Sequence, residues 1–483
     1  MIAYPRPIDL FIDGQWRAAT GTGSQPILNP ATGESLGVLR HASKGDLDHA
    51  LDAAWRGFEI WRREAPSARA NLIRRAAALL RADVDSLSQI ITLEQGKPLA
   101  EAKGEVVRAA EILEWDAGEA QRAYGRLVPG ASNLRQSVIA RPIGPVAAFA
   151  TWNVPVISPS RKIGGALAAG CSVVIKASEE TPASAIALVK CFEKAGLPPG
   201  VLNLVFGDPA EISAYLIASP KIRMATLTGP IHVGKTIAGL CAQNMKPANL
   251  ELGGHSPLIV CDDVDAVAAG RLTASARYRN AGQICTAPTR LMVHEKLYQP
   301  FVDAFIARTR ELRVGDGADI ANDMGPMANP RRIAAMETFM ADALRRGAKC
   351  GLGGNRIGNQ GFFFEPTVLT DVPAHALLMN EEPFGPIALI APFATLDEAI
   401  AQANALPYGL AAYAYTKSID RVAQLSAELE SGSLCINHVN GAALPELPLG
   451  GVKESGYGHE GGAESLDAYM TKMVVSEAIG ADL

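Results

Sequence analysis

Cysteine is scarce in this sequence, and the cysteines that occur follow no pairing pattern. There are seven in 483 residues, their spacings are wide, and no C-x-x-C motif is present. An odd number of scattered cysteines argues against a disulfide framework and fits reduced thiols in the cytoplasm. The eight histidines form no H-x-x-x-H motif and no Cys/His cluster. We therefore expect no metal site.

The sequence also lacks a basic stretch, a leader and an uninterrupted long apolar run. Its net charge is −5 and its pI is near 6.0, which argues against nucleic acid or an anionic membrane as a partner. Residues 1–14 show neither the basic nor the apolar region of a secretory signal, which again favours the cytoplasm. The uncharged stretch 142–160 contains four prolines, which do not suit a spanning helix. We expect a buried strand followed by a loop there.

The composition that remains is that of a globular protein with more than one domain. Hydrophobic residues make up 48% of the chain, and a chain of this length is expected to form two to three domains. The first third is rich in helical periodicity, with apolar residues three and four positions apart. Helices are expected there at 44–61, 66–83 and 85–118.

After the helical third, short apolar strands alternate with helices, as in a doubly wound parallel sheet. The expected strands are 146–149, 172–176, 201–206 and 224–227, with helices at 181–194 and 212–218. A second alternating block at 256–416 has expected strands at 258–260, 291–293 and 387–392. Binding sites in such sheets lie beyond the carboxyl ends of the strands.

Two segments of the sequence leave the α/β pattern. Residues 124–140 read as an extended arm, and residues 467–478 near the other end of the chain are strand-like. We expect that the second segment could pair with the first.

Two short motifs at strand ends could bind a nucleotide. Residues 229–234 (GPIHVG) follow a strand and open a helix, whose free N–H groups could hold a pyrophosphate; a glycine turn with no ligand is the alternative. Lys176 and Glu179, in the segment KASE, follow another strand. A carboxylate there could bind the ribose hydroxyls of NAD and repel a 2′-phosphate, or the segment could be a solvated charged turn.

Two further residues have the chemistry of a nucleophile and a base. Cys285 lies in NAGQICTA, a turn between a helix and a strand, and Glu251 lies in NLELGG. A cysteine is more often a buried, inert side chain, and a glutamate among apolar neighbours could instead be the partner of a buried arginine. As a general base it would profit from a pKa raised by burial.

Taken together, these motifs resemble the aldehyde dehydrogenase superfamily over almost the whole chain. They occur in the family's order, and the interval of 34 residues from Glu251 to Cys285 is the family's spacing. Thr151 and Val154 replace a more usual Pro and Phe, and Pro230 replaces a Ser. The matching segments are 29–33 (NPATG), 151–155 (TWNVP), 176–179, 227–230, 251–254, 282–285, 381–386 (EEPFGP) and 448–456 (PLGGVKESG).

The resemblance implies a role for each matched residue. Cys285 would be the nucleophile, the Asn153 side chain and the Cys285 amide the oxyanion hole, and Glu251 the base that activates the deacylating water. Family branches that transfer the acyl group to coenzyme A commonly lack this glutamate, so its presence favours hydrolysis to the acid. Lys162 and Glu460 match positions that relay protons from Glu251. The implied NAD-binding residues are Trp152, Lys176, Glu179, Gly229, Pro230, Gly234, Leu252, Glu382 and Phe384.

The resemblance also implies a domain organisation. The fold would be α/β, with a doubly wound parallel-sheet NAD-binding domain, a second α/β catalytic domain and a small β oligomerisation arm, assembled into a homodimer or homotetramer. The NAD-binding domain would comprise 1–122, 142–252 and 448–466, the catalytic domain 253–447, and the arm 123–141 and 467–483.

Within the superfamily the sequence is most similar to succinate-semialdehyde and 2-oxoglutarate-semialdehyde dehydrogenases. Arg161 and Arg279 occupy the positions at which such enzymes bind the distal carboxylate of the substrate, and paired guanidinium groups suit that role. Ala443 stands where some succinate-semialdehyde enzymes carry a substrate-binding Ser, which favours the bulkier 2-oxoglutarate semialdehyde. The alternatives are structural arginines in an enzyme for aromatic or aliphatic aldehydes, or a non-catalytic protein that kept the fold.

Overall fold

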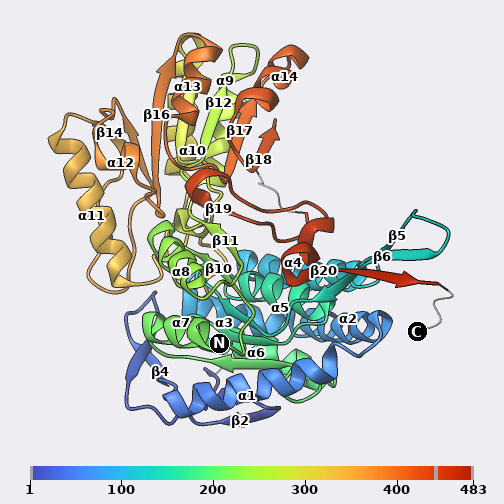
Figure 1. Ribbon diagram of the computed structural model, residues 1–483. Coiled ribbons are helices and arrows are strands. Elements are labelled where there is room, and N and C mark those ends of the chain that lie inside the picture. The colour runs from blue at the N-terminus through green and yellow to red at the C-terminus, as the bar shows by residue number, and fades with distance from the viewer. Residues whose placement is uncertain (1–3, 440–443, 480–483) are drawn as a thin grey trace.

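Two largely parallel β-sheets form the body of the protein, and a small three-stranded sheet projects from it (Figure 1). The structure is a computed structural model that describes residues 4–439 and 444–479. Ala443, which the sequence analysis singled out, lies outside these residues.

The first sheet has the strand order β19-β11-β10-β7-β8-β9-β1-β2. Its five central strands are parallel, while β19 at one edge and β1 with β2 at the other are antiparallel. The strands are β1 Leu10–Ile12, β2 Gln15–Arg17, β7 Val146–Phe149, β8 Val173–Lys176, β9 Leu202–Val205, β10 Met224–Gly229, β11 Ala248–Leu252 and β19 Gly456–Tyr457.

Helices α1 to α8 accompany the first sheet. The first of them begins at a capping box, in which Ser43 and Asp46 satisfy each other's backbone N–H groups and so fix the helix start. The helices are α1 Lys44–Trp61, α2 Pro66–Ala82, α3 Val84–Gln95, α4 Leu99–Glu119, α5 Ile157–Ala169, α6 Pro182–Lys194, α7 Pro209–Ala218 and α8 Ile231–Gln243.

The second sheet has the order β14-β15-β16-β13-β12-β17-β18, and all its neighbours are parallel except β14. Its strands are β12 Pro257–Val260, β13 Arg290–His294, β14 Lys349–Leu352, β15 Thr367–Thr370, β16 Ile387–Phe393, β17 Ala411–Tyr415 and β18 Ser433–Ile436. Its helices are α9 Ala266–Arg277, α10 Glu295–Arg310, α11 Pro330–Arg345, α12 Leu377–Asn380, α13 Leu396–Asn404 and α14 Ile419–Glu428, and the 3-10 turn η1 is Arg279–Gly282. Two more 3-10 turns follow near the end of the chain, η2 Lys453–Ser455 and η3 Ala463–Tyr469.

Alternate residues of β12 belong to different cores. Leu258 and Val260 join one buried cluster, and Ile259 joins another. Because side chains alternate across a strand, these clusters cover opposite faces of the second sheet, as a doubly wound sheet requires. The first sheet has a core of its own. The predicted α/β architecture is thus confirmed, while the predicted domain boundaries stay a prediction.

The third sheet joins two segments that lie far apart in the sequence. Strand β20, Met470–Ala478, pairs antiparallel with β6, Leu134–Pro142, and β6 also pairs with β5, Arg126–Val128. The predicted pairing of tail and arm is confirmed, and Figure 1 shows this sheet pointing away from the body. A separate hairpin is formed by β3, Ser24–Leu28, and β4, Ser35–Arg40.

Three expectations about local structure were wrong. The helix expected at 85–118 is two helices, because Gly96 takes a left-handed φ of 93° and Pro98 follows it, and both features end helices. The loop expected up to residue 160 ends earlier, since α5 starts at Ile157 and holds Pro159 in its first turn, where no N–H bond is lost. The helix-rich first third also opens with strands β1 to β4.

No helix within residues 4–439 and 444–479 is long and apolar enough to cross a membrane.

Candidate active site

A cavity of about 1080 Å³ lies at the carboxyl ends of the parallel strands of the first sheet and is closed by loops of the second sheet. Ligands of α/β sheets bind in this position. Most of the predicted site residues line this cavity: Trp152, Asn153, Arg161, Gly229, Pro230, Glu251, Leu252, Arg279, Cys285, Glu382, Phe384 and Glu460. Four predicted site residues lie outside its lining: Lys162, Lys176, Glu179 and Gly234.

Cys285 lies in the loop between η1 and β13. The backbone before it is unusual, because Asn280, Ala281 and Gly282 all have positive φ angles, between 48° and 71°. A side chain at Gly282 would come within 2.3 Å of the Gly385 carbonyl oxygen, so only glycine fits this turn. The tight turn brings the Cys285 thiol to the cavity, where its Sγ donates to Glu251 Oε1 at 3.2 Å.

Glu251 is the buried acceptor of that thiol. It lies on β11, opposite Thr228 of β10, and its side chain is 5% exposed. Burial raises the pKa of Glu251, as does the nearby charge of Glu460, while Lys162, Cys285 and Thr228 act in the opposite direction. Burial also raises the pKa of Cys285 well above its usual value, followed by the charge of Glu251. The thiol therefore holds its proton in this state, and the carboxyl group beside it is placed to take it.

Lys162 of α5 is fully buried at the inner end of the site. Its Nζ donates to Glu460 Oε1 at 2.5 Å and to Thr228 Oγ1 at 2.8 Å. The Lys162 and Glu460 side chains are 0% and 3% exposed. A buried charge must be paired, and here each group of the pair neutralises the other. The pair acts on Glu251 through its charges.

Asn153 follows β7 and faces the loop of Cys285. Its Nδ2 donates to the Gln283 carbonyl at 3.1 Å, and its Oδ1 accepts from the Thr151 hydroxyl at 2.7 Å. The Cys285 N–H, the other predicted oxyanion donor, donates to no backbone carbonyl among the described residues. Asn153 and Cys285 line the same cavity, as the predicted oxyanion hole requires.

The amino end of α8 faces the cavity at the end of β10. Pro230 is the N-cap, just before the helix rather than inside its first turn, and Gly229 and His232 also line the cavity. Gly234 lies one turn further and packs on Leu252, because a Cβ there would come within 2.4 Å of the leucine side chain. The helix can therefore approach β11 closely and offer its free N–H groups to an anion.

An aromatic pair, Trp152 and Phe384, and the buried carboxyl group of Glu382 also line the cavity. The rings of Trp152 and Phe384 meet edge to face at 5.5 Å. Burial raises the pKa of Glu382 to about 8. Its Oε1 has no hydrogen-bond partner among the residues that the structure describes. A buried oxygen of this kind needs a donor, and a sugar hydroxyl is one.

Lys176 and Glu179, at the end of β8, form an ion pair with each other. Both side chains are largely buried, 6% and 12% exposed. The carboxylate of Glu179 is therefore partly neutralised by its neighbour.

The two arginines both reach the cavity but differ in surroundings. Arg161 of α5 is 8% exposed, and its Nη1 donates to the Glu460 carbonyl at 3.3 Å. Arg279, at the start of η1, is exposed, and no ion pair involves it among the described residues. It lies close enough to the half-buried Glu101 to lower the pKa of that carboxyl, although loss of solvent around the carboxyl raises that pKa overall. Neither arginine forms an ion pair with another of the described residues, and their role in binding the substrate stays a prediction.

Several cavity and neighbouring residues escaped the sequence analysis. Thr228 and Gln283 lie inside the matched motifs LTGP and GQIC, and their positions next to assigned residues could have indicated a role. Asn280 likewise opens the quoted segment NAGQICTA, whereas Lys97 and Glu101 carry no such signal. Their place at the site depends on contacts across the fold.

Comparison with known proteins gives a consistent result. The model of the family described as "Aldehyde dehydrogenase family" matches residues 16–475. A 4-(hydroxymethyl)benzenesulfonate dehydrogenase of Comamonas testosteroni is 47% identical over 463 residues, which cover 96% of each chain. A glutarate-semialdehyde dehydrogenase of Pseudomonas aeruginosa is 40% identical, with 95% of each chain covered. The crystal structure of a succinate-semialdehyde dehydrogenase from Burkholderia pseudomallei superposes with a TM-score of 0.95 at 40% identity and covers 98% of each chain.

Proposed function

This chain belongs to the aldehyde dehydrogenase family, and we propose that it oxidises an aldehyde with a remote anionic group to the corresponding acid. The observation that carries this proposal is that Arg161 and Arg279 line the same cavity as Cys285. Two guanidinium groups beside a nucleophile favour a substrate whose far end is negatively charged.

In the first half of the proposed reaction, Cys285 is the nucleophile. Its proton passes to Glu251, for which the 3.2 Å contact is suited, and the thiolate forms a bond to the aldehyde carbon. The aldehyde oxygen becomes an oxyanion that accepts from Asn153 Nδ2 and from the Cys285 N–H. A bound NAD or NADP would supply the hydride acceptor, and loss of hydride from the thiohemiacetal carbon would leave a thioester to Cys285.

In the second half, Glu251 first gives up the proton taken from Cys285, by way of Thr228 and the Lys162–Glu460 pair beside it, and the regained carboxylate then removes a proton from water. The resulting hydroxide attacks the thioester carbon, the carbon–sulfur bond breaks, and the acid leaves with the Cys285 thiolate as the departing group. A buried carboxyl group with a raised pKa is suited to this step near neutral pH.

The cavity residues fit a nicotinamide dinucleotide. The amino end of α8 would hold the pyrophosphate at Gly229 and Pro230, with Gly234 and Leu252 allowing the close approach of helix and strand. The unpartnered Glu382 oxygen would accept from a ribose hydroxyl, and Trp152 and Phe384 would bound the ring.

We further propose that NAD is preferred to NADP. Lys176 and Glu179 would bind the adenosine ribose, and Glu179 would repel a 2′-phosphate. Its ion pair with Lys176 limits this repulsion, so the preference for NAD should be modest.

The substrate would be a semialdehyde, either 2-oxoglutarate semialdehyde or succinate semialdehyde. The named relatives support an anionic substrate, because glutarate and succinate semialdehydes carry a carboxylate and 4-(hydroxymethyl)benzenesulfonate carries a sulfonate. The last of these, at 47% identity, makes a sulfonated aromatic aldehyde the second candidate. Both candidates use the same arginines, so the nature of the anion is what a substrate panel must decide.

The test is a steady-state NADH assay with the two semialdehydes, 4-formylbenzenesulfonate, and the neutral controls butanal and benzaldehyde. Losing one charge-assisted contact should cost about 1.5–3 kcal/mol, which is on the order of tenfold to a hundredfold in kcat/KM. Arg161→Ala and Arg279→Ala should each show this loss with anionic aldehydes only. Arg310→Ala, which removes an exposed arginine of α10, is the matched control and should change nothing.

Equal losses with neutral and anionic aldehydes would mean that the arginines support the fold or the loop of Cys285. A wild-type enzyme that prefers butanal over succinate semialdehyde would also contradict the proposal. A preference for succinate semialdehyde over the 2-oxo acid would overturn only the choice between the two acids.

A further inference from the structure

Asn153 is held on two sides by polar groups that the reaction itself does not use, the half-buried Thr151 hydroxyl and the buried Lys97 ammonium. We infer that Thr151 and Lys97 are positioning residues, which keep the Asn153 amide nitrogen directed at the oxygen of the aldehyde. This inference rests on the proposed function, because it assigns a purpose to contacts around the proposed oxyanion donor.

The Gln283 carbonyl selects which way the Asn153 amide points, and the hydrogen bond from the Thr151 hydroxyl holds the amide in that orientation. The Thr151 hydroxyl donates to Asn153 Oδ1 at 2.7 Å, and the Gln283 carbonyl accepts from Nδ2 at 3.1 Å. In the opposite orientation Oδ1 would face the Gln283 carbonyl oxygen, and two acceptors would then repel each other. Only the orientation with nitrogen on the side of the Cys285 loop satisfies both neighbours. Threonine stands here in place of the proline that the family resemblance leads one to expect, and proline has no hydroxyl to donate.

The backbone of Asn153 is held by a buried charge. Lys97 Nζ donates to the Asn153 carbonyl at 2.8 Å and to Glu105 Oε2 at 2.5 Å. The Lys97 and Glu105 side chains are only 4% and 3% exposed. Hydrogen bonds from a charged donor are shorter and stronger than neutral ones, so the Asn153 carbonyl has little freedom to move.

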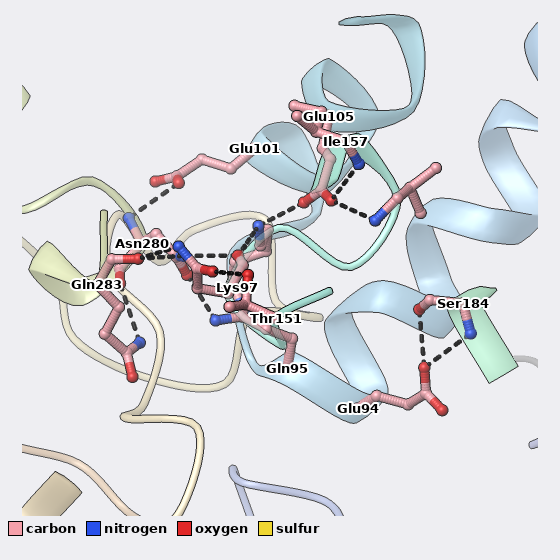
Figure 2. Close-up of polar contacts among 12 residues, drawn as sticks. Glu94, Gln95, Lys97, Glu101, Glu105, Thr151, Ile157, Ser184, Asn280 and Gln283 are labelled. Atoms are coloured by element: carbon pink, nitrogen blue, oxygen red, sulfur yellow. Dashed lines mark hydrogen bonds and ion pairs between the residues drawn. The ribbon is translucent and has the colours of Figure 1, made fainter. Parts of the chain in front are cut away.

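The same ion pair also holds the start of α5. Glu105 Oε1 accepts from the backbone N–H of Val156 at 2.8 Å and of Ile157 at 3.4 Å. These are the first residues of the helix that carries Arg161 and Lys162. Figure 2 shows Glu105 beside Ile157, the first residue of this helix.

Asn280 connects this arrangement to the loop of the nucleophile. Its Nδ2 donates to the Asn153 carbonyl at 3.0 Å, and its Oδ1 accepts from Gln95 Nε2 at 2.8 Å. Glu101 accepts from the Asn280 backbone N–H at 2.9 Å (Figure 2). These contacts hold Asn280 in its left-handed conformation, five residues before Cys285. One carbonyl oxygen, that of Asn153, is therefore the common acceptor that keeps the oxyanion donor in register with the thiol.

The decisive experiment compares Thr151→Val, which removes only the hydroxyl, with Thr151→Ser, which restores it. The first readout is the rate constant of the NADH burst, which reports addition to the aldehyde and hydride transfer. The second is alkylation of Cys285 by iodoacetamide, followed at that residue by peptide mass spectrometry. Alkylation needs the thiolate but creates no oxyanion, so a misdirected amide should leave it unchanged.

We expect Thr151→Val to slow the burst by about threefold to tenfold, the value of one neutral hydrogen bond. Thr151→Ser should return the burst rate constant to within about twofold of wild type, and Asn153→Ala should lower it by a factor of about 10²–10³. Thr92→Val is the matched control, because the Thr92 hydroxyl is buried and has no partner among the described residues; it should leave both readouts unchanged.

A second variant tests the backbone contact. Lys97→Met combined with Glu105→Gln removes both buried charges while keeping an amide oxygen for the start of α5. The rate constant of the NADH burst should fall at least as far as in Thr151→Val. Thermal unfolding is measured alongside to show that the variant is folded.

Three outcomes overturn the inference. The first is a burst rate constant of Thr151→Val equal to that of wild type, and the second is a Thr151→Ser variant that does not restore this rate constant. The third is a fall of the burst rate constant together with the rate of Cys285 alkylation, which would assign Thr151 to the support of Cys285. A burst that survives in Cys285→Ala would instead overturn the proposed function, and the inference with it.

Discussion

Replacing Glu251 by glutamine should separate the two halves of the reaction. The substitution removes the carboxylate that accepts from Cys285 Sγ at 3.2 Å and keeps the shape of the side chain. It also removes the charge that, after burial, does most to raise the pKa of the thiol. The thiol of the variant should therefore ionise at lower pH than that of wild type, which offsets the loss of the base in the first half-reaction.

No such compensation exists for the second half-reaction. Water has to lose a proton to Glu251, and a positioned general base contributes about 10²–10⁴ in rate. We therefore expect Glu251→Gln to keep its NADH burst within about tenfold of wild type, while steady-state turnover falls by about 10²–10⁴. Glu337→Gln, an exposed position on α11, is the matched control.

The pH dependence has a definite sign. A base with a raised pKa is protonated, and inactive, at pH values where an ordinary carboxyl with a pKa of about 4.3 is already ionised. Wild-type steady-state turnover should therefore fall as pH is lowered through the raised pKa of Glu251, and Glu251→Gln should lose this limb of the profile.

The assay is stopped-flow NADH absorbance with and without hydroxylamine, which attacks a thioester without needing a base. Added hydroxylamine should restore much of the turnover of Glu251→Gln. If the burst itself disappears and hydroxylamine has no effect, Glu251 acts before the thioester forms, and its assignment as the deacylating base is wrong.

Three further results are expected. Cys285→Ala should abolish aldehyde oxidation while NAD still binds, as measured by quenching of tryptophan fluorescence; turnover comparable to wild type would contradict the covalent mechanism. Wild type should prefer NAD to NADP by a modest factor in kcat/KM, and Glu179→Gln should narrow that factor; an unchanged ratio would show that Glu179 does not face the 2′ position. The protein should be a homodimer or homotetramer by light scattering, because the three-stranded sheet exposes Leu127 and Val474 at 75% and 73% and such strands are usually covered by a partner; a monomer at assay concentration would refute this.

Local signals in the sequence were sufficient for many elements of the fold. Helix α1 was predicted with its observed bounds from its apolar periodicity, and the structure adds a capping box at Ser43 that fixes its start. Helix α6 was predicted from Pro182, which suits a first turn, and from the glycine that follows its end. The pairing of β20 with β6 could be predicted because both segments read as extended and leave the α/β pattern of the rest of the chain.

Contacts across the fold could not be predicted in the same way. The positions of Cys285, Glu251 and Asn153 followed from motifs whose order is shared with a family. Lys97 lies 56 residues from Asn153 in the sequence, between two helices that periodicity alone joined into one. Its ammonium group becomes a contact of Asn153 only once α4, α5 and the loop after β7 are packed together, and no spacing in the sequence expresses that packing.

The last segment of the chain completes both the site and the arm, which bears on how the protein folds during synthesis. Glu460 follows its partner Lys162 by 298 residues, and β20 supplies the edge of the three-stranded sheet from residues 470–478. Domains fold from the amino end as the chain leaves the ribosome, so the first sheet can form early. Until residue 460 has emerged, however, the partly folded chain holds the buried Lys162 without its counter-charge. A nascent chain can neither complete this catalytic centre nor close its arm, and a product truncated before β19 would expose an unpaired edge at β11.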